Sequence, residues 1–224
     1  MNCYHLYAKC IAPLRNNTLL FKLLFGFCPS DALWGQYWDW TTLSLRGSLK
    51  RTLKPETKLL DMGCGAYAVL SRYAQIKLSC RAVTAVDHFM ELIEYAKQHD
   101  PESGIEYLCS DLFSNVQGVY SLIVFNAPYL ETEKGKRLGL FQDDFAQKRF
   151  CGGKDGADTI TRFLHDLPEY LSQGGRVLLG VNHYHISKEV VRAAIHKAGL
   201  KNLSFHYNPL TNACVYELKK EQYA

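Results

Sequence analysis

Apolar residues along this chain follow two patterns: short continuous runs, and longer stretches with helical spacing. Continuous runs of this length are typical of strands buried on both faces of a sheet. We predict strands in the run that ends at Leu59 and Leu60, in Arg81 to Val86, in Ile105 to Cys109, in Ser121 to Phe125 and in 174–179. Helical patterns alternate with them in 66–72, 90–98, 158–171 and 188–198, and two closing strands are predicted in 203–206 and 213–218. This alternation predicts an α/β domain with a mostly parallel sheet.

An apolar run, Leu19 to Phe27, precedes this pattern. It is interrupted by Lys22 and is far shorter than the roughly 20 residues that a membrane span needs, so we predict no span. No small-residue cleavage site of a secretory signal follows it. We expect residues 1–34 to form a helical extension that packs on a domain of residues 35–224; a lid over a site or a partner-binding helix is the alternative.

Composition narrows the class of protein only slightly. A hydrophobic fraction of 47% and a charged fraction of 21% are ordinary for a globular domain and argue against disorder. A net charge of +4 neither requires nor excludes a nucleic-acid partner. The eight cysteines show no C-x-x-C pair and no zinc-ligand spacing. We therefore predict no disulfide framework, no metal site and a cytoplasmic location.

The first predicted strand passes through Asp61 into a tight turn, Gly63-Cys64-Gly65, and then into helix-forming residues. Such a turn lets backbone N–H groups and a helix N-terminus approach a ligand closely, because glycine has no Cβ. Nucleotide-like cofactors bind at such turns, although many glycine turns bind no ligand.

Acidic residues follow the next two predicted strands. Asp87 lies a little beyond the usual spacing at which a strand-end acid binds ribose hydroxyls in dinucleotide folds, and we count its neighbour His88 among the candidate cofactor-binding residues. Asp87 could instead cap the helix that follows. After the third strand, Asp111 could accept the exocyclic amine of an adenine while Leu112 offers a backbone N–H; an exposed loop acid would look the same.

The fourth predicted strand opens into the tetrapeptide Asn126-Ala127-Pro128-Tyr129. Ligands of open α/β sheets bind outside the carboxyl ends of the strands, so this motif is expected beside the cofactor. The side-chain oxygen of Asn126 and the carbonyl of Ala127 are acceptors, and Tyr129 gives an aromatic wall. Together they suit a planar amide or amine.

The segment ahead of the first strand is rich in aromatic and hydroxyl residues. It could fold back over the cofactor turn, where Asp39, Thr41 and Thr42 would offer hydrogen bonds and Trp38 or Trp40 a flat face. Burial in the core is the equally weighted alternative.

These motifs, in this order, resemble the class I S-adenosylmethionine-dependent methyltransferases. Asn126-x-Pro128-Tyr129 resembles the Asn-Pro-Pro-Tyr motif of members that methylate planar nitrogens, and Gly152-Gly153-Lys154-Asp155-Gly156 is similar to a loop of the HemK-type glutamine methyltransferases. The resemblance implies a Rossmann-like fold with a seven-stranded, mostly parallel sheet and helices on both faces.

The resemblance also implies roles for the motif residues. Asp61, Gly63, Cys64, Gly65 and Tyr67 would surround the methionine part of S-adenosyl-L-methionine. Asp87 would bind the ribose, and Asp111 with Leu112 the adenine. Asn126 and the Ala127 carbonyl would bind the NH₂ group of the methyl acceptor, Pro128 would hold the backbone between them, and Tyr129 would pack on the acceptor plane.

Two positions depart from the family pattern. Ala127 stands where proline is usual, which keeps the carbonyl but adds an N–H and frees φ. Tyr67 stands where the turn usually has a third glycine, so the cofactor pocket is expected to be reshaped or partly closed. The usual substrate is therefore not carried over.

We predict methyl transfer to a nitrogen of a planar amide or amine, on a small molecule or a protein side chain. The alternatives are aminocarboxypropyl transfer or cyclisation of the same cofactor, methylation of adenine in nucleic acid, which the low net charge does not favour, and a non-catalytic subunit.

Two further segments are ambiguous. The long connection 130–158 carries mixed charges and faces the substrate or is a solvated insertion. Near the end of the fifth strand, His183 and His185 form an H-x-H pair, for which a solvated or substrate-lining loop is favoured over a metal site.

Overall fold

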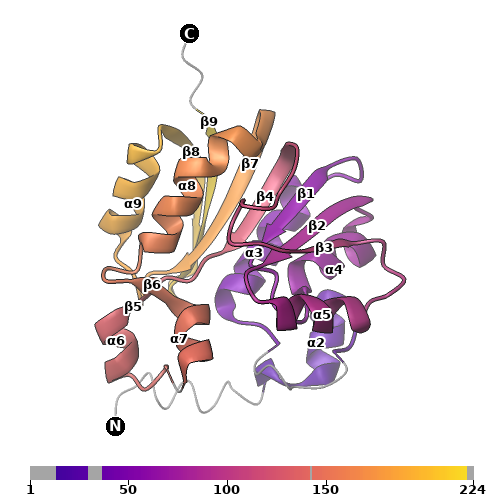
Figure 1. Ribbon diagram of the computed structural model, residues 1–224, viewed down its shortest axis with the longest axis horizontal. Helices are drawn as coiled ribbons and strands as arrows, with labels where there is room; N and C mark the ends of the chain where they lie inside the picture. The colour runs from indigo at the N-terminus through magenta and orange to yellow at the C-terminus, as the bar shows by residue number, and fades with distance from the viewer. Residues whose placement is uncertain (1–13, 30–36, 142, 221–224) are drawn as a thin grey trace.

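A seven-stranded sheet in the order β3-β2-β1-β4-β7-β9-β8 forms the centre of the computed structural model (Figure 1). The model describes residues 14–29, 37–141 and 143–220; Cys3, Cys10 and the predicted boundary between 34 and 35 lie outside them. The strands are β1 (Lys58–Met62), β2 (Ala82–Asp87), β3 (Glu106–Cys109), β4 (Tyr120–Asn126), β7 (Leu171–Asn182), β8 (Leu200–Tyr207) and β9 (Ala213–Lys220). Among these strands only β9 is reversed in direction, since β7 and β8 on its two sides run the same way as β1 to β4. The predicted seven-stranded, mostly parallel sheet is therefore confirmed.

Helices cover both faces of the sheet because neighbouring strand residues point to opposite sides. Leu59, Leu122 and Leu178 pack against α3 (Trp40–Thr52), α4 (Val69–Leu78) and α5 (Met90–Gln98). Leu60, Ile123 and Leu179 pack against α8 (Asp158–Tyr170) and α9 (Lys188–Lys197), which lie in front of the sheet in Figure 1. The predicted continuous apolar strands are therefore buried from two sides.

The apolar run near the N-terminus forms α2 (Thr18–Phe25), which packs on α4 through buried aromatic side chains. Phe21 and Phe25 are fully buried, and Phe25 packs edge-on against Tyr73 of α4. Leu19 and Leu23 point outward and are exposed. No helix in the described ranges has the length and apolar character to cross a membrane.

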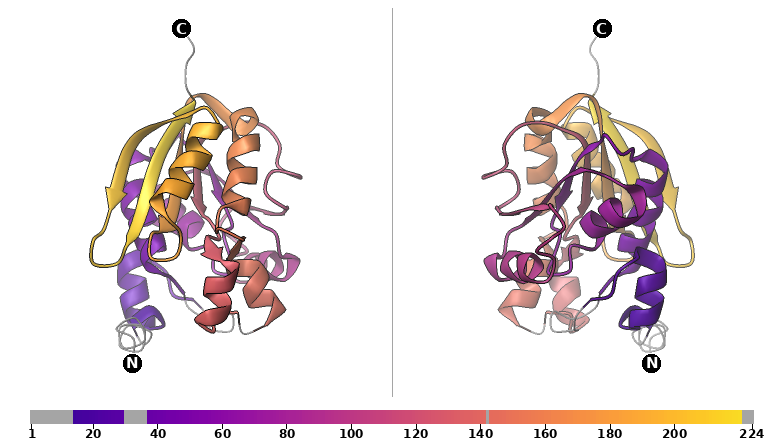
Figure 2. Two further views of the ribbon diagram at one scale, coloured as in Figure 1. Left: turned by 90° about the vertical axis from the view of Figure 1, so that its left-hand side faces the viewer. Right: turned by 90° about the vertical axis from the view of Figure 1, so that its right-hand side faces the viewer.

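Two predicted segments differ from the structure. The helix predicted from Ala66 begins at Val69, because Ala68 has a left-handed φ of 42° that a continuous helix cannot include. The connection after β4 is not a plain loop: it holds α6 (Thr132–Arg137) and α7 (Asp144–Phe150) between two short paired strands, β5 (Leu130–Glu131) and β6 (Cys151–Gly153). Both views of Figure 2 place α6 and α7 at the same end of the molecule as α2.

Candidate functional site

The N-terminus of α3 holds the side chain of Asn126 at the end of β4. Asp39 is the N-cap of α3, and its Oδ1 accepts hydrogen bonds from the Thr42 N–H at 2.6 Å and the Thr42 hydroxyl at 2.7 Å. Asn126 donates through Nδ2 to Thr42 Oγ1 at 3.2 Å and to Asp39 Oδ1 at 3.4 Å. A carboxylate only accepts hydrogen bonds, so the amide nitrogen must face Asp39.

This orientation turns the amide oxygen of Asn126 away from the cap. Asn126 Oδ1 is buried and accepts no hydrogen bond from any described residue. A buried acceptor without a donor costs about 1–3 kcal/mol, so such an atom in a native fold calls for an explanation. A donor on a bound molecule would supply one.

The rest of the tetrapeptide is fixed by its backbone and by α3. The N–H of Ala127 donates to the carbonyl of Gly180 in β7 at 3.3 Å. Alanine at this position thus makes a backbone hydrogen bond that the proline of the family motif could not make. A Cβ on Gly180 would lie 2.7 Å from Thr41, which shows how closely α3 approaches β7. Thr41 Oγ1 in turn lies 3.1 Å from the hydroxyl of Tyr129, within hydrogen-bonding distance.

The Gly-Gly-x-Asp-Gly loop packs its backbone directly on the same tetrapeptide. A Cβ on Gly152 would collide with the carbonyls of Gly156 and Pro128. A Cβ on Gly156 would lie 2.5 Å from the carbonyl oxygen of Tyr129. These glycines therefore serve close packing behind the motif.

The glycine turn after β1 is tied to Asp87 at the end of β2. Asp87 accepts from the Gly65 N–H at 2.9 Å through Oδ2 and from the Phe89 N–H at 3.1 Å through Oδ1. Burial raises the pKa of Asp87, and these N–H groups and the charge of Arg149 oppose the rise. The N-cap of α5 is Phe89, so Asp87 is not the helix cap that was the alternative.

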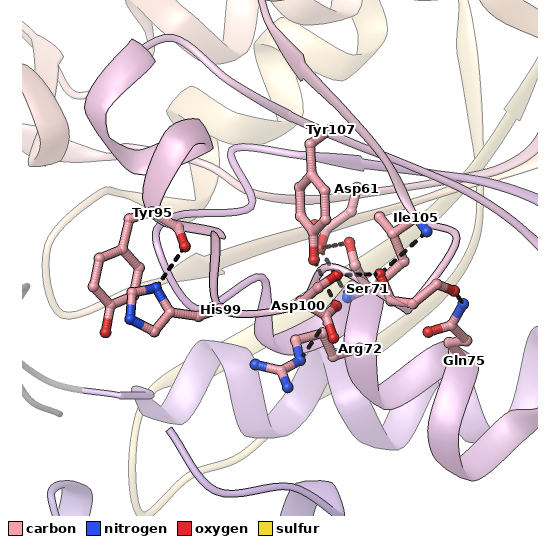
Figure 3. A network of polar contacts seen from close by, with 10 residues as sticks. Asp61, Ser71, Arg72, Gln75, Tyr95, His99, Asp100, Ile105 and Tyr107 are labelled. Atoms are coloured by element: carbon pink, nitrogen blue, oxygen red, sulfur yellow. Dashed lines mark hydrogen bonds and ion pairs between the residues drawn. The ribbon is translucent and has the colours of Figure 1, made fainter. Parts of the chain in front are cut away.

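Asp61 lies inside β1 rather than in the turn, and its side chain points toward α4. It is 2% exposed, and its Oδ2 accepts from the N–H of Ser71 at 3.0 Å and from the Ser71 hydroxyl at 2.6 Å (Figure 3). Burial is the largest influence and raises the pKa of Asp61 to about 7, against these hydrogen bonds. Beside it, Tyr107 donates to Asp100, which also pairs with Arg72.

The raised pKa of Asp61 predicts a pH dependence of stability. Between about pH 4 and 7 the folded state holds a proton that the unfolded state has lost, so the free energy of unfolding falls as pH rises. Relative to Asp61→Asn, the wild type is expected to lose roughly 3 kcal/mol between about pH 5 and pH 8. Urea unfolding at both pH values measures this difference. The control Asp144→Asn, at an exposed position, should show the same change of the free energy of unfolding with pH as the wild type. An equal change in the wild type and in Asp61→Asn would contradict the prediction.

The structure does not bring every predicted cofactor residue to the glycine turn. Asp39 and Thr41 reach the tetrapeptide instead, and Trp38 is buried in the aromatic cluster under α2. Asp111 is exposed and pairs with Arg162 of α8 at 2.7 Å, while His88 is exposed after β2.

Two other predicted cofactor residues, Leu112 and Tyr67, are buried, and Cys64 is half-buried. Leu112 has a left-handed φ of 49° and packs in the core. Tyr67 packs edge-on between Tyr37 and Tyr95, with ring centroids 5.2 and 5.9 Å away. Burial raises the pKa of the Cys64 thiol well above its usual value, so this thiol stays protonated.

Two residues near the site were not identified as site residues from the sequence. Arg149 reaches from α7 to the glycine turn, where its Nη2 lies 3.8 Å from the position of a Cβ on Gly65. The ring of His185 lies 6.2 Å from that of Tyr129 at 27°, so it stands beside the tetrapeptide. Burial first, then Lys134, lowers the pKa of His185 to about 4, so its ring is neutral at pH 7.

The H-x-H pair does not form a shared site. His183 contacts the Ile186 carbonyl and the Tyr216 hydroxyl through its two ring nitrogens, each at 3.0 Å. Across the ranges that the structure covers, no three His, Cys, Asp or Glu side chains lie together as metal ligands would.

Comparison with known proteins finds no matching family model. The chain is 33% identical over 121 residues to a candidate protein N5-glutamine methyltransferase of Methanocaldococcus jannaschii, covering 53% of this chain and 58% of that protein. It is 33% identical over 166 residues to the ribosomal protein L11 methyltransferase of Thermosipho africanus, covering 73% and 52%. The chain thus spans little more than half the length of these relatives.

Solved structures agree on the fold. A methyltransferase from Pyrococcus furiosus superposes with a TM-score of 0.62 at 18% identity, covering 94% of this chain and 97% of that one. The chain has the fold of the class I S-adenosylmethionine-dependent methyltransferases and resembles the HemK-type protein glutamine methyltransferases.

Proposed function

We propose that this protein is an S-adenosylmethionine-dependent methyltransferase that modifies the side-chain nitrogen of a glutamine-like residue in a protein. The observation that carries the proposal is the fixed amide of Asn126, whose buried oxygen accepts from no described residue. The relatives from Methanocaldococcus jannaschii and Thermosipho africanus are named as methyltransferases of protein glutamine and of a ribosomal protein, which supports a protein acceptor.

The residues around the glycine turn fit the cofactor. Asp87 is buried at the end of β2, where a carboxylate suits a ribose diol, and Asp61 lies behind the turn where an ammonium group would lower its pKa. The bound cofactor would supply a methyl group on a positively charged sulfur for in-line displacement. We propose that Gly63, Cys64 and Gly65 line its methionine part, next to Tyr67.

The tetrapeptide then has a defined task. An amide nitrogen is a weak nucleophile because its lone pair is delocalised. Acceptors at Asn126 Oδ1 and the Ala127 carbonyl would hold both of its hydrogens, favour a tetrahedral nitrogen and stabilise the positive charge that develops there. Tyr129, bonded to Thr41, would hold the plane of the amide. Alignment of nucleophile and methyl group is the main contribution. The N–C bond forms as the S–C bond breaks, the sulfur leaves as neutral S-adenosylhomocysteine, and the methylated nitrogen releases one proton to water, so no tuned general base is required.

The acceptors to test first are proteins of the ribosome and soluble translation factors. DNA and RNA oligonucleotides are tested in parallel as alternative acceptors. The protein is incubated with methyl-tritiated S-adenosylmethionine and each fraction, and labelled peptides are sequenced by mass spectrometry. We expect label on a glutamine side chain.

Other results would redirect the assignment. Label in adenine would support a nucleic-acid methyltransferase, and release of methylthioadenosine without an acceptor would indicate cleavage or cyclisation of the cofactor. A protein that binds no cofactor at millimolar concentration would be a non-catalytic subunit.

We also propose that the protein acts in the cytoplasm. The six described cysteines are all free thiols, as expected in a reducing compartment, and translation proteins would be accessible there.

A further inference from the structure

Helix α7 carries a cationic side chain into the predicted cofactor site. Arg149 Nη2 lies 3.8 Å from where a Cβ on Gly65 would be, and its guanidinium interacts electrostatically with Asp87, Tyr67 and Asp39. These three residues come from different parts of the fold: the end of β2, the turn before α4 and the N-cap of α3. The guanidinium therefore lies where these segments converge.

The position of α7 is set by an aromatic contact. Phe145, one turn before Arg149, packs on Phe89 with ring centroids 4.7 Å apart. Phe89 is also the residue whose N–H is bound by Asp87. The helix is thus seated on the segment after β2, and Arg149 on the same helix is directed to the glycine turn.

The charges of the site explain why a cation is useful there. Asp87 and Asp61 lie at and behind the glycine turn, where carboxylates suit the ribose and ammonium groups of S-adenosylmethionine. The cofactor also carries a carboxylate, and these acids would repel it. Arginine matches a carboxylate with two parallel N–H donors and stays protonated even though burial lowers its pKa.

A purely structural role for Arg149 is the competing explanation. Asp87 could be the reason for its position, since the two charges interact. However, both oxygens of Asp87 already accept backbone N–H groups, so the carboxylate is held in place by Gly65 and Phe89. Arg149 also lies over the ring of Phe150, 5.2 Å from its centroid, and a guanidinium with five N–H donors can bind a ligand beside such contacts.

We infer that Arg149 binds the carboxylate of the cofactor's amino acid arm, so that α7 forms one wall of the cofactor site. This inference rests on the proposed function. It makes Arg149 a ligand-positioning residue contributed by the connection between β4 and α8, outside the sequence motifs that predicted the site.

The test compares two ligands that differ in the arm. S-Adenosylhomocysteine carries the carboxylate, and methylthioadenosine lacks the whole arm. Calorimetric titration of Arg149→Gln is expected to show about 10- to 100-fold weaker binding of S-adenosylhomocysteine, the range for a charge-assisted hydrogen-bonded contact. Binding of methylthioadenosine should stay within about twofold of wild type. Arg149→Lys should weaken the binding of S-adenosylhomocysteine less than Arg149→Gln does.

Lys148→Gln is the matched control, because Lys148 is the exposed neighbour on the same helix. It should bind both ligands like wild type, and thermal unfolding of all variants checks that the fold is kept. If Arg149→Gln weakened the binding of both ligands equally, or bound S-adenosylhomocysteine more tightly than wild type, the inference would be overturned. The wild-type protein would still bind both ligands, so the proposed function would stand. A wild-type protein that binds neither ligand would instead reject the proposed function and this inference together.

Discussion

The Asn126→Ala variant is expected to lose about 10²- to 10³-fold in the rate of methyl transfer, the range seen when one preorganised hydrogen-bonding group is removed from an active site. The physical reason is that the amide oxygen of Asn126 would hold an acceptor N–H while positive charge develops on the nitrogen. Affinity for S-adenosylhomocysteine should change little, because the glycine turn and Asp87 are untouched. Single-turnover rates with the labelled acceptor and calorimetry with S-adenosylhomocysteine measure the two effects separately.

Two further variants sharpen this result. Thr42→Val removes the hydroxyl that accepts from Asn126 Nδ2 but leaves Asn126 in place, so an intermediate loss of rate is expected. Asn202→Ala changes an exposed asparagine on β8 and should behave like wild type. If Asn126→Ala transferred methyl groups at the wild-type rate, the tetrapeptide would not be the acceptor site.

Replacing Gly156 by alanine is expected to destabilise the fold by roughly 3 kcal/mol or more and to displace Tyr129. Gly156 has a φ of +85°, which costs a residue with a Cβ about 1–2 kcal/mol. The added Cβ would also lie 2.5 Å from the Tyr129 carbonyl oxygen, a backbone atom that cannot rotate away. Urea unfolding measures the loss of stability, and the rate of methyl transfer reports the displacement.

Gly174→Ala separates these two causes. Gly174 has a similar φ of +73°, but a Cβ there would meet no atom within 4 Å. It should therefore lose only the conformational part, about 1–2 kcal/mol, and keep its activity. Equal destabilisation of the two variants would show that the close approach of Gly156 to Tyr129 is not important.

The elements that could be predicted from the sequence are those whose pattern is local. The run Ser121 to Phe125 is continuous and apolar because β4 is covered on both faces, and it was recognised for that reason. The start of α4 was predicted three residues too early. Ala66 and Tyr67 favour a helix by composition, and nothing in their identity reveals the left-handed φ of Ala68.

The candidate site was predicted less completely, because its contacts join distant segments. Asp39 and Thr42 were expected to offer hydrogen bonds, but their binding to Asn126 depends on how α3 packs against β7 at Gly180. Arg149 was one of several charged residues in a connection without periodicity. Only the folded position of α7 separates it from its exposed neighbour Lys148.

The short pairing of β5 with β6 bears on how such proteins diversify. Leu130 pairs with Cys151 and Glu131 with Gly153 in a separate two-stranded sheet, so the two ends of the excursion meet beside the main sheet. Because the entropic cost of closing a loop grows only with the logarithm of its length, lengthening or shortening the excursion costs little. The segment that carries α6 and α7 can therefore change in length without altering the strands or the tetrapeptide.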